Sequence, residues 1–342
     1  MNWSNPVRRL RPIIATVALS SLLLAGCGGG DEPEAAPSAE PTASAETSTP
    51  TPEPEPVVWP LTGLERDGAA PKHPVLVTKI DNTASSAPQV GLSKADLVVE
   101  ELVEGGMTRL AAFFYSAAPK EVGPVRSMRA SDIGIVPTGA TVVTSGAANV
   151  TLNRVRGAGI PWVTEGDTGV YRNSSRYAPY NLFADLSTIA KGTKAGKEPA
   201  TYLPFGEAAD LPKGKKATTL SADFGNHTTS WRFEGGTYVN TNSYAGADDQ
   251  FPATSILVMR VDVGDAGYLD PSGSFVPESK IVGTNEALLF HNGRVIAGTW
   301  SKKGLRTAIT LTTKSGEDLV VPAGRVWIEM VPKGTGGVTW AK

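Results

Sequence analysis

The feature that most limits the fold is a series of short β-rich runs between about residue 217 and residue 342. Turn-forming dipeptides separate several of these runs, namely Gly235-Gly236, Asn292-Gly293 and Ser315-Gly316. Asn-Gly between two apolar runs is the strongest short-range signal for a β-hairpin. Regularly spaced short strands with such turns are typical of an antiparallel sandwich or barrel. We therefore expect a mostly antiparallel β domain, sandwich or barrel-like, over residues 206–342.

The preceding part of the chain, residues 58–205, has a different pattern. Its strand-like runs lie at 75–80, 97–103, 108–115 and 140–145, and its helix-like runs lie at 127–135 and 149–156. The mixture shows no βαβ repeat, so it indicates a mixed α/β N-terminal domain. A Lys-, Gly- and Pro-rich stretch at 191–216 connects the two halves as a linker or a long surface excursion. The predicted fold class of the whole chain is α+β.

The N-terminus has the pattern of an export signal. Three arginines precede an apolar run from Ile13 to Leu24, which is shorter than the roughly 20 residues of a membrane-spanning helix. The run ends in Leu24-Ala25-Gly26-Cys27, and Cys27 is the one cysteine of the chain. This quartet resembles the lipobox of bacterial lipoproteins, which implies cleavage before Cys27 and acylation of its thiol. We expect a signal peptide at 1–26 and a lipid anchor in the outer face of the cytoplasmic membrane, exposed to the cell wall.

Residues 27–57 are predicted to be a disordered tether. This segment is rich in Pro, Ser, Thr and Glu, and its seven acidic residues face no Lys or Arg. Such a composition cannot bury enough apolar surface to offset the entropy lost on ordering. The tether would hold the folded domains away from the membrane.

Charge and composition exclude several classes of function. The 342 residues include 32 basic and 34 acidic side chains, a net charge of −2, which argues against a nucleic-acid-binding protein. A single cysteine excludes an intramolecular disulfide and cysteine-rich zinc sites. None of the three histidines lies in a polar block of the first half, and no Gly-x-Ser-x-Gly motif is present, which argues against a Ser-His-Asp hydrolase. We expect no cofactor, although a divalent cation on carboxylates stays an open alternative.

Charged side chains gather around a hairpin predicted at Gly105-Gly106. Placing this dipeptide in a two-residue turn sets Leu102 opposite Arg109. Glu100 and Glu104 then lie diagonal to Arg109, within reach of its long side chain. The arrangement predicts either an ion-pair cluster on a solvated face or a polar pocket.

Residues near the hairpin in sequence support the pocket. Glu101 falls on the apolar face of the hairpin, so it must be paired or protonated. A helix over 127–135 would place Ser127 near its N-terminus, where backbone N–H groups suit an anion. Arginines in polar segments recognise phosphate or carboxylate through two parallel hydrogen bonds. The candidate ligand-binding residues are Lys79, Asp81, Asn82, Glu100, Glu104, Arg109, Arg126, Arg129, Arg172, Arg176 and Asn181.

Ordered sequence blocks carry a family resemblance. They are Lys79-Ile-Asp-Asn82, Ala87-Pro-Gln-Val-Gly-Leu92, Ala95-Asp96, Glu101-Leu-Val-Glu-Gly-Gly106, Thr108-Arg109, Val122-Gly-Pro-Val-Arg-Ser127, Arg172-Asn-Ser-Ser-Arg176, Ala178-Pro-Tyr-Asn181, Gly298-Thr-Trp-Ser-Lys302 and Gly324-Arg-Val-Trp327. Together they resemble the YerB-like family of bacterial lipoproteins over about residues 60–335. The resemblance implies an envelope lipoprotein of two joined domains, with no established reaction. Relatives often carry histidine where this chain has Tyr180, and a tyrosine, which titrates near pH 10, is a poor substitute in acid–base chemistry.

Three functions are consistent with these features. The first is a non-enzymatic lipoprotein, held in membrane lipid by acylated Cys27, that binds an anionic cell-wall glycan or polymer or an envelope protein. The second is an enzyme acting on wall glycan or a phosphate-linked lipid carrier, with Asp81 or Glu104 moving protons and arginines stabilising negative charge. The third is a structural scaffold of the envelope.

Overall fold

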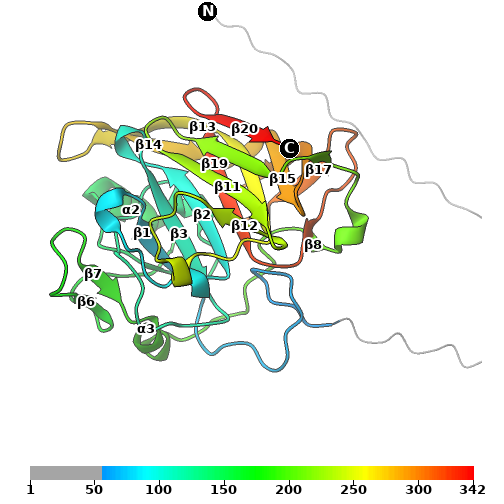
Figure 1. Ribbon diagram of the computed structural model, residues 1–342. Helices are drawn as coiled ribbons and strands as arrows, with labels where there is room; N and C mark the ends of the chain where they lie inside the picture. The colour runs from blue at the N-terminus through cyan, green and yellow to red at the C-terminus, as the bar shows by residue number, and fades with distance from the viewer. Residues whose placement is uncertain (1–55) are drawn as a thin grey trace, which may run out of the picture. The chain divides into compact units, whose positions relative to one another are not determined.

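The computed structural model describes residues 56–342, and its main element is a mixed sheet of 12 strands (Figure 1). These strands are β1 (Leu76–Asp81), β2 (Leu97–Leu102), β3 (Thr108–Phe114), β4 (Thr141–Val143), β5 (Trp162–Val163), β9 (Lys215–Lys216), β13 (Ser255–Leu269), β14 (Phe275–Lys280), β15 (Gly283–His291), β16 (Arg294–Lys302), β17 (Thr310–Thr313) and β19 (Val326–Pro332). Their order is β17-β16-β15-β13-β19-β2-β3-β1-β4-β5, with β14 and β9 attached to β13 and β16. The predicted signal peptide, Cys27 and tether residues 27–55 lie outside the described residues.

A second sheet and short pairings complete the β structure. The four-stranded sheet contains β10 (Thr219–Asp223), β11 (Thr228–Glu234), β12 (Thr237–Asn240) and β20 (Gly337–Ala341). The two-stranded pairs join β6 (Val170–Arg172) to β7 (Leu182–Ala184), and β8 (Phe205–Gly206) to β18 (Val321–Pro322).

The helices between residues 56 and 342 are short. They are α1 (Asp132–Ile135), α2 (Asn149–Gly157) and α3 (Leu186–Gly192), with 3-10 turns η1 (Ala84–Ser86), η2 (Leu92–Lys94), η3 (Glu104–Gly106), η4 (Ala208–Asp210) and η5 (Ala247–Asp249). Within this part of the chain, none has the length and apolarity that a membrane crossing needs.

Both faces of the large sheet are buried. On one face, Val98 and Trp327 of the large sheet join a core with Leu220 and Trp231 of the four-stranded sheet, whose strand β11 overlies β19 and β2 in Figure 1. On the other face, side chains of the large sheet form a second core with side chains from loops and short helices, including Met128, Ile135 and Val155. Alternate residues of β2 therefore enter different cores, because successive strand side chains point to opposite faces.

The predicted α+β class is confirmed. Few helices accompany many strands, and the second half is mostly antiparallel. The predicted Asn292-Gly293 turn joins β15 to β16, and both of its residues have the positive φ (47° and 65°) that a type I′ turn requires. The parallel pairing of β19 with both β13 and β2 departs from the antiparallel pattern, and it joins strands of the two halves in one sheet.

The predicted register of the Gly105-Gly106 hairpin is wrong by one residue. Glu104–Gly106 forms a 3-10 turn instead of a two-residue turn, so Leu102 pairs with Thr108 and Glu101 pairs with Arg109. A shift of one residue moves side chains to the opposite face. Glu101 and Arg109 consequently share one face, and Glu100 lies on the other.

The helix predicted at 127–135 is also shorter than expected. Helix α1 begins only at Asp132, so Ser127 lies ahead of it and has no helix N-terminus to complement an anion. The helix predicted at 149–156 is confirmed as α2. The 191–216 segment is largely exposed, as a surface excursion should be, but it buries Leu203.

Candidate functional site

Three arginines from two segments converge at the ends of β1 and β3. Arg109 of β3 lies opposite Asp81 of β1 in the sheet register. Arg126 and Arg129 come from the segment after Pro124, which is tied to β1 by the Arg126 N–H donating to the Lys79 carbonyl at 2.9 Å. This backbone contact explains why residues distant in sequence from the hairpin meet it.

Two of these arginines have carboxylate partners. Arg129 makes two parallel hydrogen bonds to Glu104, at 2.5 and 2.7 Å, and Arg126 Nε lies 3.0 Å from Asp81 Oδ2. Burial works to raise the pKa of Glu104, but the hydrogen bond and the positive charge of Arg129 outweigh burial and lower it. Glu104 is therefore a carboxylate in the folded protein at neutral pH.

Arg109 differs from its two neighbours because no carboxylate neutralises it directly. It is 9 % exposed, and within residues 56–342 no ion pair reaches it. Its guanidinium donates through Nη1 to the Ser127 carbonyl at 3.0 Å. Burial, followed by the positive charge of Arg129, lowers the pKa of Arg109 to about 10. A buried guanidinium with unused donors and two further cations beside it is chemically suited to a carboxylate or phosphate.

A buried ion cluster supports this site from inside the sheet. The Lys79 ammonium, fully buried, donates to Glu101 and, at 2.8 Å, to Asp132. Burial opposes the charge on Lys79, but the carboxylates of Asp132 and Glu101 outweigh burial and raise its pKa. Burial, and next the charge of Asp132, raises the pKa of Glu101. The prediction that Glu101 is paired or protonated is confirmed by its contact with Lys79.

Asn82 and Glu100 belong to a separate buried network on the opposite face. The Asn82 amide donates to Glu100 at 3.0 Å and to Thr108 at 2.9 Å, and the Thr229 hydroxyl donates to Glu100 at 2.9 Å. The expectation that Glu100 lies diagonal to Arg109 is wrong, because the hairpin register differs and Glu100 points to the other face of the sheet. Glu100 is fully buried there, so it takes no part in a solvated ion-pair cluster.

Glu329 and His227 complete that network, and sequence reasoning missed both. Glu329 of β19 lies beside Glu100 in the parallel register, and it accepts a hydrogen bond from Trp231 Nε1 at 2.7 Å. Burial, together with the charge of Glu100, raises the pKa of Glu329 well above the usual value, whereas His227 lowers the pKa of Glu100 despite burial. Glu100 therefore carries the charge and Glu329 the proton. The sequence does carry one sign of the Glu329 site, because Glu329 is a single acidic residue within the apolar run 326–331.

The remaining candidates lie around a loop beside the arginine cluster. Arg172 pairs with exposed Glu165 and donates to Asn181 at 2.6 Å. Arg176 donates to the Ser86 carbonyl at 2.9 Å. The end of this loop that leads into β7 reaches Arg126, whose guanidinium lies 5.3 Å from the Tyr180 ring centroid, within cation–π range.

The described residues offer no dedicated metal centre. Between residues 56 and 342, no group of three or more His, Cys, Asp or Glu side chains is arranged to hold a metal ion. The Glu100–Glu329 pair accepts hydrogen bonds from protein donors, with Thr229 donating to Glu100 and Trp231 to Glu329.

Comparison with known proteins gives two family matches along the chain. The model described as "Protein of unknown function (DUF3048) N-terminal domain" matches residues 61–199, and its C-terminal counterpart matches residues 218–328. The chain belongs to the DUF3048 family. The two matches fall on either side of residues 200–217, where the sequence pattern also changes.

A relative and a solved structure agree with this DUF3048 membership. "Putative lipoprotein YerB" of Bacillus subtilis (strain 168) is 24 % identical over 297 residues, which cover 80 % of this chain and 86 % of the relative. The crystal structure of YerB protein from Bacillus subtilis matches with a TM-score of 0.68 and 22 % identity. That match covers 83 % of this chain and 99 % of the YerB chain, and it shows a shared fold. The resemblance to the YerB-like family is thus confirmed.

Proposed function

We propose that this DUF3048 protein is a cell-envelope lipoprotein that binds an anionic cell-wall polymer at the arginine cluster Arg109, Arg126 and Arg129. The observation that carries the proposal is Arg109, a nearly buried guanidinium without a direct carboxylate partner. Arg126 and Arg129 already have carboxylate partners, so their role is to add positive electrostatic potential around Arg109 and to form the walls of the site. No covalent step is part of this function.

The surroundings of Arg109 support binding of a ligand anion. Glu104 forms an ion pair with Arg129, and Asp81 forms one with Arg126. These ion pairs hold the two arginine side chains in place before a ligand arrives. A ligand phosphate or carboxylate would compensate a charge that burial disfavours, and charge-assisted hydrogen bonds are about twice as strong as neutral ones. The Tyr180 ring beside Arg126 adds a flat surface at the edge of the cluster.

Binding to a purified polymer tests the site. The full-length chain in detergent is titrated with a polyglycerol-phosphate polymer, and its melting temperature and dissociation constant are measured. Arg109→Gln should weaken binding by about tenfold or more, the usual size of one lost charge-assisted contact. Arg232→Gln is the matched control, because it removes the same charge from an exposed ion pair outside the candidate residues and should change affinity little. Equal affinity of the Arg109→Gln variant would overturn the proposal.

The anchor is part of the proposal. Cleavage before Cys27 and acylation of its thiol would fix the protein to the outer face of the cytoplasmic membrane, facing the wall, and the relative named as a lipoprotein supports this. Stable anchoring needs two or more acyl chains, which a bacterial lipoprotein modification supplies. Cys27→Ala should move the protein from the membrane fraction to the soluble fraction. Retention of the variant in the membrane would contradict the lipid anchor.

A further inference from the structure

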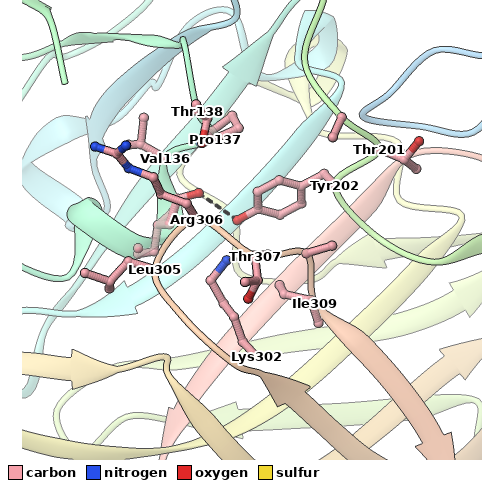
Figure 2. A pocket seen from close by; sticks show the side chains of 14 residues that line it. Val136, Pro137, Thr138, Thr201, Tyr202, Lys302, Leu305, Arg306, Thr307 and Ile309 are labelled. Atoms are coloured by element: carbon pink, nitrogen blue, oxygen red, sulfur yellow. Dashed lines mark hydrogen bonds between the residues drawn. The ribbon is translucent and has the colours of Figure 1, made fainter. Parts of the chain in front are cut away.

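A separate hollow lies on the far side of the second core, between the loop after α1, residues 200–202 and the β16–β17 loop (Figure 2). Its volume is about 80 Å³, larger than the roughly 10–15 Å³ needed for one water. The polar side chains that line it are Thr138, Thr201, Tyr202, Lys302, Arg306 and Thr307. Its lining contains two cations and no carboxylate.

Lys302 is the unusual member of this lining. It is the last residue of β16 and is 7 % exposed, yet no ion pair within residues 56–342 includes it. Its ammonium donates to the Thr307 carbonyl, a neutral acceptor. Burial lowers the pKa of Lys302. Buried lysines in folded proteins are almost always paired, so an uncompensated one needs an explanation.

Tyr202 lies next to Lys302 in the same hollow. Figure 2 shows its hydroxyl and the Lys302 ammonium on the same side of the space, with the hydroxyl donating to the Ile135 carbonyl at 2.8 Å. The Tyr202 ring packs against Phe113 with centroids 5.2 Å apart, which fixes the position of the hydroxyl. The inner end of the hollow is therefore rigid and positively charged.

The outer end of the hollow is apolar and opens further. An adjoining hollow of about 390 Å³ shares Val136, Leu305 and Arg306 with the first and extends over Ile133 and Ile160. Arg306 is held between the two by donating to the Ala158 carbonyl at 2.9 Å, and Figure 2 shows its guanidinium turned away from Lys302. Leu305 is 49 % exposed at this opening, so a ligand could cover apolar surface there.

We propose that this hollow is a second anion site, which takes the terminal carboxylate or phosphate of a small amphiphilic molecule. The anionic group lies against the Lys302 ammonium, which gives one of its three donors to the Thr307 carbonyl, while the Tyr202 hydroxyl stays bonded to the Ile135 carbonyl. The apolar part extends past Arg306 over Leu305. The lining favours this ligand class because both cations lack a carboxylate in the hollow while the outer wall is apolar. The site shares no residue with the arginine cluster, so it does not depend on the function proposed above.

The titration of Lys302 gives a direct readout. The full-length chain with ¹³C-labelled lysine is studied in detergent by NMR, and the Lys302 signal is assigned by its loss in Lys302→Met. Butyrate and inorganic phosphate are the two anion probes, and n-butanol is the neutral probe. An anion within about 4–6 Å should raise the Lys302 titration midpoint by about 1 pH unit or more.

The response to the three probes decides the proposal. A rise with butyrate alone identifies a carboxylate site assisted by apolar contact, and a rise with phosphate, alone or with butyrate, identifies the anionic group as the main determinant. Either result supports the proposal. The proposal is overturned if neither anion raises the Lys302 titration midpoint, or if n-butanol raises this midpoint as much as the anions do.

Variants separate this site from the arginine cluster and from a folding defect. Arg306→Gln changes an exposed residue, so the protein should stay folded while butyrate binds about two- to tenfold more weakly. Arg109→Gln should leave the Lys302 response unchanged even where polymer binding is lost. An unchanged butyrate affinity in Arg306→Gln, read from the Lys302 signal, would show that the anion does not enter through this hollow and would overturn the proposal.

Discussion

At the scale of single residues, the buried charges were only partly predictable. Strand alternation was enough to require a partner for Glu101, and the structure supplies Lys79. The identity of that partner, and of Glu329 beside Glu100, depends on which strands become neighbours in the sheet. A sequence pattern gives the face of a strand but not its neighbour, so contacts between distant strands stay hidden until the topology is known.

Glu329 should make the stability depend on pH. Its folded pKa lies above the ordinary value of 4.5, so the folded state holds a proton that the unfolded state releases as pH rises. Stability from this group is therefore complete below 4.5 and declines with rising pH, by about 1.4 kcal/mol per pH unit until the folded pKa is reached. Glu329→Gln keeps the acceptor for Trp231 and removes the titration.

The measurement is denaturant unfolding of both proteins at about pH 5 and about pH 8. Glu329→Gln should gain stability relative to the natural chain at the higher pH, with Glu100 and His227 as the titratable neighbours in both proteins. Glu317→Gln, at an exposed site, is the control and should show no such gain. A constant difference between the two pH values would contradict the assignment of the proton to Glu329.

Lys79 should be essential to stability. Lys79→Met removes the cation shared by Glu101 and Asp132 and leaves two carboxylates without their partner. Breaking a buried ion pair from one side typically costs about 3–5 kcal/mol, and the unfolding free energy should fall by that amount. Lys72→Met, at an exposed position, should cost little. Equal stabilities of the two variants would show that the buried cluster contributes nothing net.

At the scale of elements, the hairpin between β2 and β3 shows what a turn signal can miss. Gly105-Gly106 correctly indicated where the chain reverses, but the extra residue of the 3-10 turn shifted the register. The turn also contacts a second turn, since the Asn226 N–H donates to the Gly106 carbonyl at 3.0 Å. A contact between two turns from different halves leaves no periodic signal in the sequence.

The two glycines of this turn should respond differently to alanine. Both have φ of +69°, so an added side chain costs roughly 1–2 kcal/mol at either position. A Cβ at Gly106 would also lie 2.9 Å from the Asn226 nitrogen, whereas a Cβ at Gly105 would meet open space. Gly106→Ala should thus lower the unfolding free energy more than Gly105→Ala, as measured by urea denaturation. Equal losses would mean that the turn moves away from Asn226 without cost.

At the scale of the whole molecule, the sequence pattern and the family matches both divide the chain into two halves. The large sheet contains strands from both halves. Pattern changes and the gap between the family matches both fall near residues 200–217. In the structure, β2 of the first half pairs with β19 of the second along five residues, and the cores on both faces draw on both halves. The order of strands from different halves in one sheet is not encoded in local periodicity, which explains why the class was predictable and the topology was not.

The shared sheet predicts one cooperative unfolding transition for the folded part. Separating the halves would expose the β2 and β19 edges and both cores, so neither half can melt without removing the burial that stabilises the other. Differential scanning calorimetry of the full-length chain should give equal calorimetric and van't Hoff enthalpies. Glu329→Gln and Lys79→Met, which change different faces of the sheet, should shift this single transition without splitting it. Two resolved transitions would show that the β2–β19 pairing is too weak to couple the halves, and they would make 58–205 and 206–342 independent folding units.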